Sequence, residues 1–188
     1  MKMNRTEDII QVIQADKWMM DILKAAQQLQ LPDWWICAGF VRSKVWDVLH
    51  GFDERTVLPD IDVVYFDEGT IDEAEEKRLE KILHKLLPEV PWSVKNEARM
   101  HVRNNLDPYS STEDAIAKFP ETATALGVKL SQDDDLILTA PHGVDDVLNM
   151  VVRPTPYFAK SAELLKIYKQ RVVEKDWSDR WNMVKVEF

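Results

Sequence analysis

Two stretches decide the fold of this chain: WWICAGFVRSKVWDVLHG, residues 34–51, and DIDVVYFD, residues 60–67. The first begins as a short apolar run rich in strand-forming residues, and this run ends at Gly39. From residue 40 to residue 50 the apolar positions recur with helical spacing, and Gly51 is a typical helix stop. The second stretch places two aspartates at the head of another apolar run. Together they predict a strand, a glycine turn, a helix and a second buried strand.

Helices and short strands alternate along the rest of the chain. Residues 4–30 are predicted as one helix, or as two if Asp16 caps the second, and we expect capping boxes at Asn4 with Glu7 and at Thr70 with Glu73. The segment 92–102 alternates apolar and polar residues, which predicts a strand with one charged face. Further predicted elements are a helix near 112–118, strands at 127–130, 136–139 and 150–156, and a last helix at 159–175. This pattern indicates a single α/β (α+β) domain over residues 1–188, with a C-terminal helix and tail (about 155–188) packed on it.

Composition narrows the class of protein. Hydrophobic residues make up 45% of the chain and there are seven Trp, so we expect a packed core that holds most of the tryptophans. The formal net charge of -9 disfavours binding to an extended nucleic acid, because an acidic surface repels phosphates. No apolar run reaches membrane-spanning length and no secretory leader opens the chain, which predicts a cytoplasmic protein without a membrane partner. The single cysteine, Cys37, is predicted to be a buried strand thiol.

The two aspartates raise the question of a cation. In a strand, Asp60 and Asp62 point to the same face about 7 Å apart. A solvated turn at the mouth of the strand explains such a pair, and so does a divalent metal. Mg²⁺ prefers oxygen ligands, often one or two carboxylates together with substrate phosphates. Two bound metals activate an attacking oxygen and stabilise a leaving phosphate.

The segment before the aspartates suits an anion. Free backbone N–H groups at the start of a helix form an anion pocket, and Gly39 lets a phosphate approach the backbone closely. Arg42 lies in the first turn of the predicted helix, where it can reach a phosphate or an aspartate. A phosphate cradle is thus followed closely by a metal-binding pair.

The motif AGFVRSKVWDVLHG, followed by DIDVVYFD, resembles the head signature of the nucleotidyltransferase superfamily, which has the DNA polymerase beta fold. It is most similar to the variant in tRNA CCA-adding enzymes and bacterial poly(A) polymerases. The resemblance implies a mixed central β-sheet flanked by helices, with Asp60 and Asp62 as metal ligands and Gly39, Phe40 and Arg42 at the nucleotide. Phe40 replaces a second glycine of that signature, and Ser43 replaces an aspartate. The segments NEARMH, APHGVDDVLNMVVRPTP and YKQRVVEKDW extend the resemblance to a bacterial family of small stand-alone nucleotidyltransferase-like proteins.

The same resemblance implies a third carboxylate on a neighbouring strand, and Glu97 is its candidate; the alternative is a contact with Lys95 or Arg99 on a solvated face. Arg99 and His101 either contact a triphosphate or an acceptor, or belong to an exposed polar stripe. We expect an Mg²⁺- or Mn²⁺-dependent transfer of a nucleoside monophosphate from a nucleoside triphosphate (NTP) to a small-molecule or protein acceptor. The alternatives are a degenerate nucleotide-binding module and, ranked lower, RNA 3′-end addition.

Overall fold

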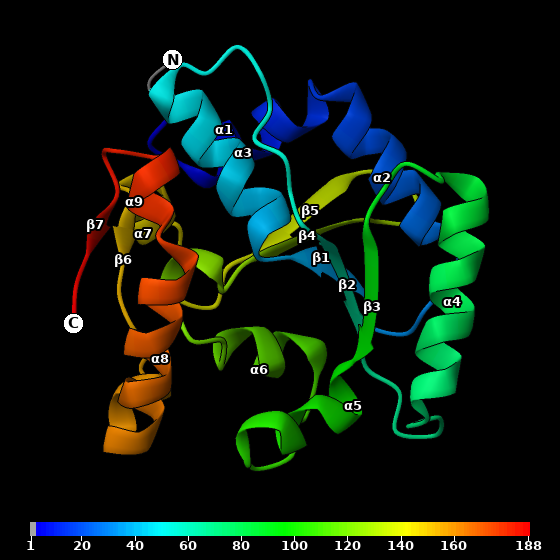
Figure 1. The fold of residues 1–188 in the computed structure, drawn as a ribbon. Coiled ribbons are helices and arrows are strands. Elements are labelled where there is room, and N and C mark those ends of the chain that lie inside the picture. Colours follow the sequence, from blue (N-terminus) through cyan, green and yellow to red (C-terminus); the bar gives the residue numbers. More distant parts are fainter. Residues whose placement is uncertain (1–2) are drawn as a thin grey trace.

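A five-stranded sheet in the order β3-β2-β1-β4-β5 forms the centre of the computed structural model, which describes residues 3–188 (Figure 1). Its strands are β1 (Trp35–Cys37), β2 (Ile61–Tyr65), β3 (Trp92–Asn96), β4 (Gly127–Leu130) and β5 (Leu136–Thr139). The β2–β3 pair is parallel and the other pairs are antiparallel. A small parallel pair, β6 (Val151–Val152) and β7 (Lys185–Val186), lies near the C-terminus. The predicted mixed sheet flanked by helices is confirmed.

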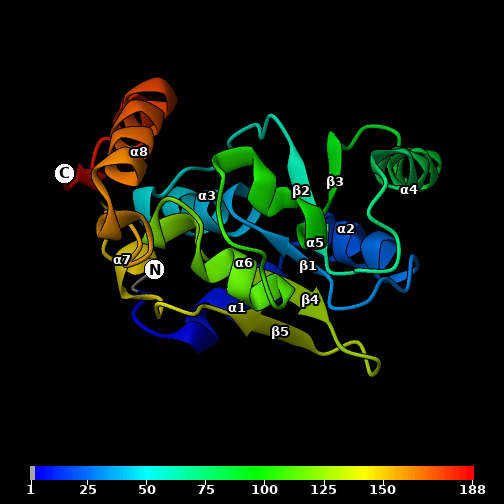
Figure 2. The same cartoon turned by 90° about the horizontal axis from the view of Figure 1, so that it is seen from below.

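The helices lie on both faces of this sheet. They are α1 (Thr6–Gln14), α2 (Lys17–Gln27), α3 (Gly39–His50), α4 (Glu73–Leu86), α5 (Glu97–Met100), α6 (Thr112–Ala117), α7 (Asp145–Leu148), α8 (Ala162–Lys175) and α9 (Trp177–Arg180). The larger core cluster holds buried residues of α1 to α4. A smaller cluster on the other face joins Trp35, Cys37 and Val64 of the sheet to Ile116 of α6. Figure 2 shows α5 and α6 together on this second side. Within the described residues, the helices are all too short or too polar to cross a membrane.

The helix of the sequence motif, α3, follows its sequence signals. The helix begins at Gly39 and ends at His50, and it is capped by Gly51, whose φ of 68° is a left-handed conformation that suits glycine. The N-terminal segment forms two helices, because the Asp16 carboxylate accepts a hydrogen bond from Met19 N–H and caps the second. The tryptophans at 34, 35, 46, 92, 177 and 181 are buried, as predicted.

Two predicted capping boxes are wrong. At α1 the Asp8 carboxylate accepts from the N–H groups of Asn4 and Arg5, so Glu7 plays no capping role there. At α4 the cap is Asp72, which accepts from Ala74 N–H at 2.9 Å. In both cases an aspartate one or two residues from the expected position supplies the oxygen, because its short side chain reaches the free N–H groups readily.

The predicted strand at 92–102 is also wrong in its second half. The strand β3 ends at Asn96, and residues 97–100 and 101–104 form α5 and a 3₁₀ turn. The Asn96 side chain ends the strand because its oxygen accepts from Ala98 N–H at 3.1 Å, as a helix cap does. The last long helix likewise begins at Ala162, where Ser161 caps it, and not at residue 159.

Candidate active site

A cavity of about 270 Å³ lies against the second face of the sheet, beside α5, α6 and α8. Its charged lining consists of two acids, Asp62 and Glu97, and four basic residues, Lys95, Arg103, Lys118 and Arg171. These side chains come from four separate stretches of the chain, at residues 62, 95–103, 118 and 171. Only the tertiary structure therefore brings them together, and the cavity combines acidic ligands for a cation with basic groups for phosphates.

Asp62 reaches the cavity from the second position of β2. It pairs with Cys37 across the antiparallel β1–β2 ladder and with Ser93 across the parallel β2–β3 ladder. Burial, reinforced by the neighbouring charge of Asp60, raises the pKa of Asp62 to about 6. Asp60 itself precedes the strand and is exposed. The two aspartates therefore lie at the mouth of β2, with Asp62 in the cavity wall.

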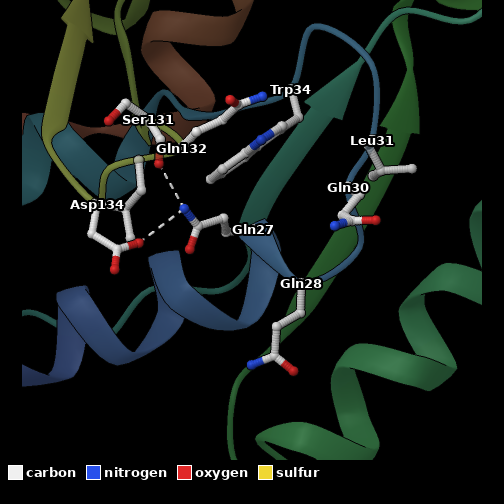
Figure 3. Close-up of a pocket in the computed structure, with 9 residues that line it drawn as sticks. Gln27, Gln28, Gln30, Leu31, Trp34, Ser131, Gln132 and Asp134 are labelled. Carbon is white, nitrogen blue, oxygen red and sulfur yellow. Dashed lines mark hydrogen bonds between the residues drawn. The ribbon is translucent and has the colours of Figure 1, made fainter.

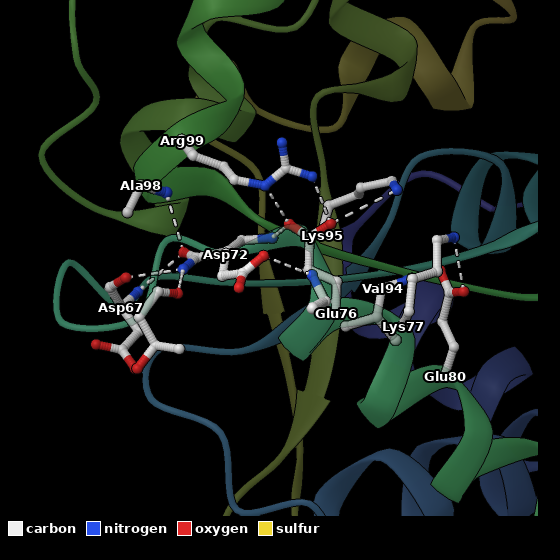
Figure 4. A network of polar contacts seen from close by, with 12 residues as sticks. Asp67, Asp72, Glu76, Lys77, Glu80, Val94, Lys95, Ala98 and Arg99 are labelled. Atoms are coloured by element: carbon white, nitrogen blue, oxygen red, sulfur yellow. Dashed lines mark hydrogen bonds and ion pairs between the residues drawn. The ribbon is translucent and has the colours of Figure 1, made fainter.

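Glu97 is placed by the turn that ends β3. Beneath this turn the buried carboxylate of Glu76, from α4, accepts from Asn96 N–H at 2.8 Å and from Arg99 Nε at 2.8 Å and Nη2 at 2.6 Å (Figure 4). Its neighbour Glu80 accepts from Val94 N–H at 3.0 Å. Side chains of α4 thus satisfy backbone donors at the open edge of β3 and hold the first residues of α5 in position. This arrangement turns Glu97 towards the cavity and Arg99 towards α4.

The environment of Glu97 favours its neutral form. The side chain is only 6% exposed, and burial, followed by the charge of Asp62, raises the pKa of Glu97 to about 8. A divalent cation relieves this repulsion, so the oxygen donors of Asp62 and Glu97 suit a hard metal chemically. Within residues 3–188, however, no three Asp, Glu, His or Cys side chains are grouped as a ready metal site. The donor set fits Mg²⁺ best if substrate oxygens complete it.

Most basic residues of the cavity were missed by sequence reasoning. Lys118 ends α6 and its ammonium group bonds Asp114 at 3.0 Å, and Arg171 lies on α8, far along the chain. Arg103 follows α5 and lines the cavity beside Glu97. Periodicity does not single out these positions, because they belong to different elements that meet only on folding, although Arg171 lies within the segment YKQRVVEKDW that extends the resemblance.

The arginine of the sequence motif lies outside this cavity lining. The Arg42 guanidinium is surrounded by tryptophan rings, with Cζ 5.2 Å from the ring centroid of Trp46, 4.8 Å from Trp177 and 5.8 Å from Trp181. Its Nη2 donates to Ser43 Oγ at 3.3 Å, and its buried Nε has no partner among the described residues. Burial lowers the pKa of Arg42 to about 10. We name this enclosure, formed by Trp46, Trp177 and Trp181, the tryptophan cage.

The other predicted nucleotide-binding residues are also absent from the cavity lining. A Cβ added to Gly39 would lie 3.4 Å from Arg42 Nη2, so the arginine occupies the space above the glycine. Phe40 is buried and packs its ring 6.2 Å from that of Trp18. His101 packs edge-on against Tyr109, which does line the cavity. Cys37 also lines the cavity, and burial raises the pKa of its thiol.

A larger hollow of about 600 Å³ lies elsewhere, where α2 and β4 end (Figure 3). It is lined mainly by amide side chains, and Gln27 Nε2 donates to Ser131 O at 2.7 Å and to Asp134 Oδ1 at 3.1 Å. No lysine or arginine contributes to its lining. This hollow lacks the charge pattern that binds phosphate and metal, and so the smaller cavity is the better candidate for chemistry.

Comparison with known proteins shows the fold and the family of this chain. An NMR structure described as revealing a CCA-adding enzyme head domain is 34% identical, with a TM-score of 0.87 over 97% of this chain and 96% of that one. Structures of CCA-adding enzyme with ATP and with CTP are 15% identical with TM-scores of 0.57, and this chain spans 43% and 42% of theirs, so they show likeness of fold. No curated protein matches the chain. The model of the nucleotidyltransferase family matches residues 24–186, and this protein therefore belongs to the nucleotidyltransferase family.

Proposed function

We propose that this protein transfers a nucleoside monophosphate from an NTP to a hydroxyl group of a small-molecule or protein acceptor. The observation that carries the proposal is the meeting of Asp62 and Glu97 with four basic side chains around one cavity. Phosphoryl-group transfer needs acidic side chains to hold a cation and basic side chains to bind the triphosphate. In such reactions, positioning and charge stabilisation supply most of the catalysis.

The metal is proposed to be Mg²⁺ or Mn²⁺. Asp60 and Asp62 would hold it, with Glu97 as a third oxygen donor. When bound, the ion supplies Lewis acidity for the acceptor oxygen and neutralises charge on the phosphates. The basic residues of the cavity wall bind the triphosphate and retain it close to Asp62. The predicted nucleotide contacts of Gly39, Phe40, Arg42, Arg99 and His101 stay predictions, since these residues do not line the cavity.

The reaction has a simple balance. The acceptor oxygen forms a bond to the α-phosphorus, the bond from that phosphorus to the bridging oxygen breaks, and pyrophosphate leaves with the electron pair. The proton of the acceptor hydroxyl passes to solvent in the same process. The cavity walls contribute by orienting the leaving pyrophosphate towards lysine and arginine side chains.

A direct test uses each NTP labelled at the α-phosphate, Mg²⁺ or Mn²⁺, and a cell extract as acceptor pool. We expect label to appear in an acceptor with the wild-type protein and to vanish with Asp60→Ala/Asp62→Ala. The exposed turn between β4 and β5 offers a matched control, Asp133→Ala/Asp135→Ala, which removes two acids with the same spacing as Asp60 and Asp62. Labelling that survives in the first variant, or never occurs with the wild type, would contradict the proposal.

A second candidate is a nucleotide-binding module without turnover. It is favoured by the enclosure of Arg42 in the tryptophan cage and by the lack of three grouped acidic ligands within residues 3–188. Measured NTP affinity without pyrophosphate release, across many acceptors, would support this candidate. RNA 3′-end addition ranks third, because a net charge of -9 disfavours binding to a long polyanion. Tight tRNA binding at low salt would reverse that order.

A further inference from the structure

We infer that Arg171, on the C-terminal helix α8, binds the β- and γ-phosphates of the nucleotide and that the buried Glu121 positions it. The inference rests on the proposed function and deepens it. It assigns the phosphate-binding role to a residue far from the glycine–arginine motif, and it makes α8 a wall of the active site.

Arg171 is held in a fixed orientation. Its Nε donates to Glu121 Oε1 at 2.6 Å, and the Glu121 side chain is fully buried. The other carboxylate oxygen of Glu121 accepts from Thr124 Oγ1 at 2.8 Å, so the carboxylate is held from both sides. An arginine side chain carries five N–H donors, and this pairing engages only the Nε edge.

The Nη groups of Arg171 are available to bind a ligand. The side chain is 35% exposed and lines the cavity, and the hydrogen bonds found among residues 3–188 include none from its Nη groups. Two parallel N–H donors on a planar guanidinium match two oxygens of a phosphate. The geometry therefore leaves the phosphate-matching part of Arg171 available while its Nε is anchored.

Arg171 lines the same cavity as Asp62. Its charge acts on Asp62 against the effects of burial and Asp60, which shows that Arg171 and Asp62 are electrostatic neighbours across the cavity. A triphosphate with its α-phosphate at Asp62 would then extend its outer phosphates towards a cation. Arg42 is the weaker candidate for that role, since the tryptophan cage encloses its guanidinium.

The test measures binding of inorganic tripolyphosphate, which lacks base and sugar, in the presence of Mg²⁺. We expect Arg171→Ala to weaken binding by about ten- to a hundredfold, as for a lost charge-assisted hydrogen bond. Arg171→Lys keeps a cation for Glu121 but loses the paired donors, so we expect a several-fold loss with little change in thermal stability. Lys169→Ala is the matched control, because Lys169 is an exposed cation on the same helix outside the cavity lining, and it should bind like wild type.

A double-mutant cycle tests the positioning role of Glu121. Glu121→Gln should weaken tripolyphosphate binding in the wild-type background and have no further effect in the Arg171→Ala background, because Glu121 acts through Arg171. A merely structural role predicts additive losses instead, and additivity would overturn the positioning role. Equal binding by wild type, Arg171→Lys and Arg171→Ala, or no binding by wild type, would overturn the inference.

The outcome is separable from that of the proposed function. If Arg171→Ala loses tripolyphosphate binding but the wild type transfers no nucleotide, then the inference holds and the transferase proposal fails. If the wild type transfers nucleotide while Arg171→Ala binds tripolyphosphate normally, then the inference fails and the transferase proposal holds.

Discussion

Asp62 of β2 and Glu97 of α5 face the same cavity, and after burial the charge of Asp62 is the largest contribution to the raised pKa of Glu97. The two carboxylates repel each other when both are ionised, and a divalent cation bound between them would relieve this repulsion. This relationship connects the stability of the protein, its response to pH and its proposed chemistry.

Replacement of Asp62 by asparagine tests the chemistry directly. We expect Asp62→Asn to lower nucleotidyl transfer by at least about a hundredfold, since it removes a charged metal ligand at the reaction centre. The fold should persist, because the amide matches the neutral form that burial favours. Initial rates of pyrophosphate release and a melting curve of the same sample provide the measurement. Full activity in Asp62→Asn would remove this residue from the mechanism.

The stability of the metal-free protein should depend on Glu97 and pH. The folded pKa of about 8 lies above the ordinary value of 4.5, so the neutral carboxyl contributes stability that is fully present below about pH 4.5 and lost as pH rises through about 8. Relative to Glu97→Gln, which does not titrate there, the wild type should lose on the order of a few kcal/mol across this window. Urea unfolding of both proteins over a pH series measures the difference, and parallel curves would contradict the expectation.

The affinity of the protein for a divalent metal should rise with pH, whereas the stability that neutral Glu97 contributes falls. Mg²⁺ or Mn²⁺ competes with protons for Asp62 and Glu97, whose raised pKa values keep protons bound well above the usual range. We expect added metal to raise the melting temperature clearly at about pH 8 and little at about pH 5, by mass action on the folded state. An equal rise in Asp60→Ala/Asp62→Ala would show that the ion binds elsewhere.

The support beneath Glu97 can be tested with two neighbouring glutamates of α4. Glu76 is fully buried and binds Arg99 at 2.6 Å, whereas Glu75 binds Arg78 at 2.6 Å on the surface. Glu76→Gln should cost roughly 2–4 kcal/mol of the free energy of unfolding, because the charge of two hydrogen bonds from the partly buried Arg99 is lost. Glu75→Gln should cost less than about 1 kcal/mol. Chemical denaturation of both variants measures this contrast, and similar losses would refute it.

The tryptophan cage should contribute strongly to the packing of the C-terminal segment. Trp177 is 5% exposed and contacts both Trp46 and Arg42. Trp177→Ala should lower the free energy of unfolding by about 3–5 kcal/mol through the loss of buried aromatic area. We expect a more exposed Arg42 in this variant. Thermal unfolding together with protease cleavage in residues 176–188 measures the effect, and an unchanged melting temperature would contradict it.

The sequence by itself determined the local elements around the motif. Apolar spacing and terminal glycines are sufficient for β1, α3 and β2, because short-range periodicity reports which face of each element is buried. The position of Asp62 at the head of β2 followed from the same reasoning. The prediction of a strand over residues 92–102 was wrong in its second half, since period-two alternation cannot reveal that Asn96 caps a helix.

Only the tertiary structure decided which residues share the cavity. Packing of α9 on α3 enclosed Arg42, the arginine that the motif singled out, in tryptophan rings. Folding of α8 onto the same side brought Arg171 to the cavity, where the buried Glu121 fixes it. Contacts between elements distant in sequence leave no periodic trace in the chain, and so the aspartate motif was visible in the sequence while its basic partners were not.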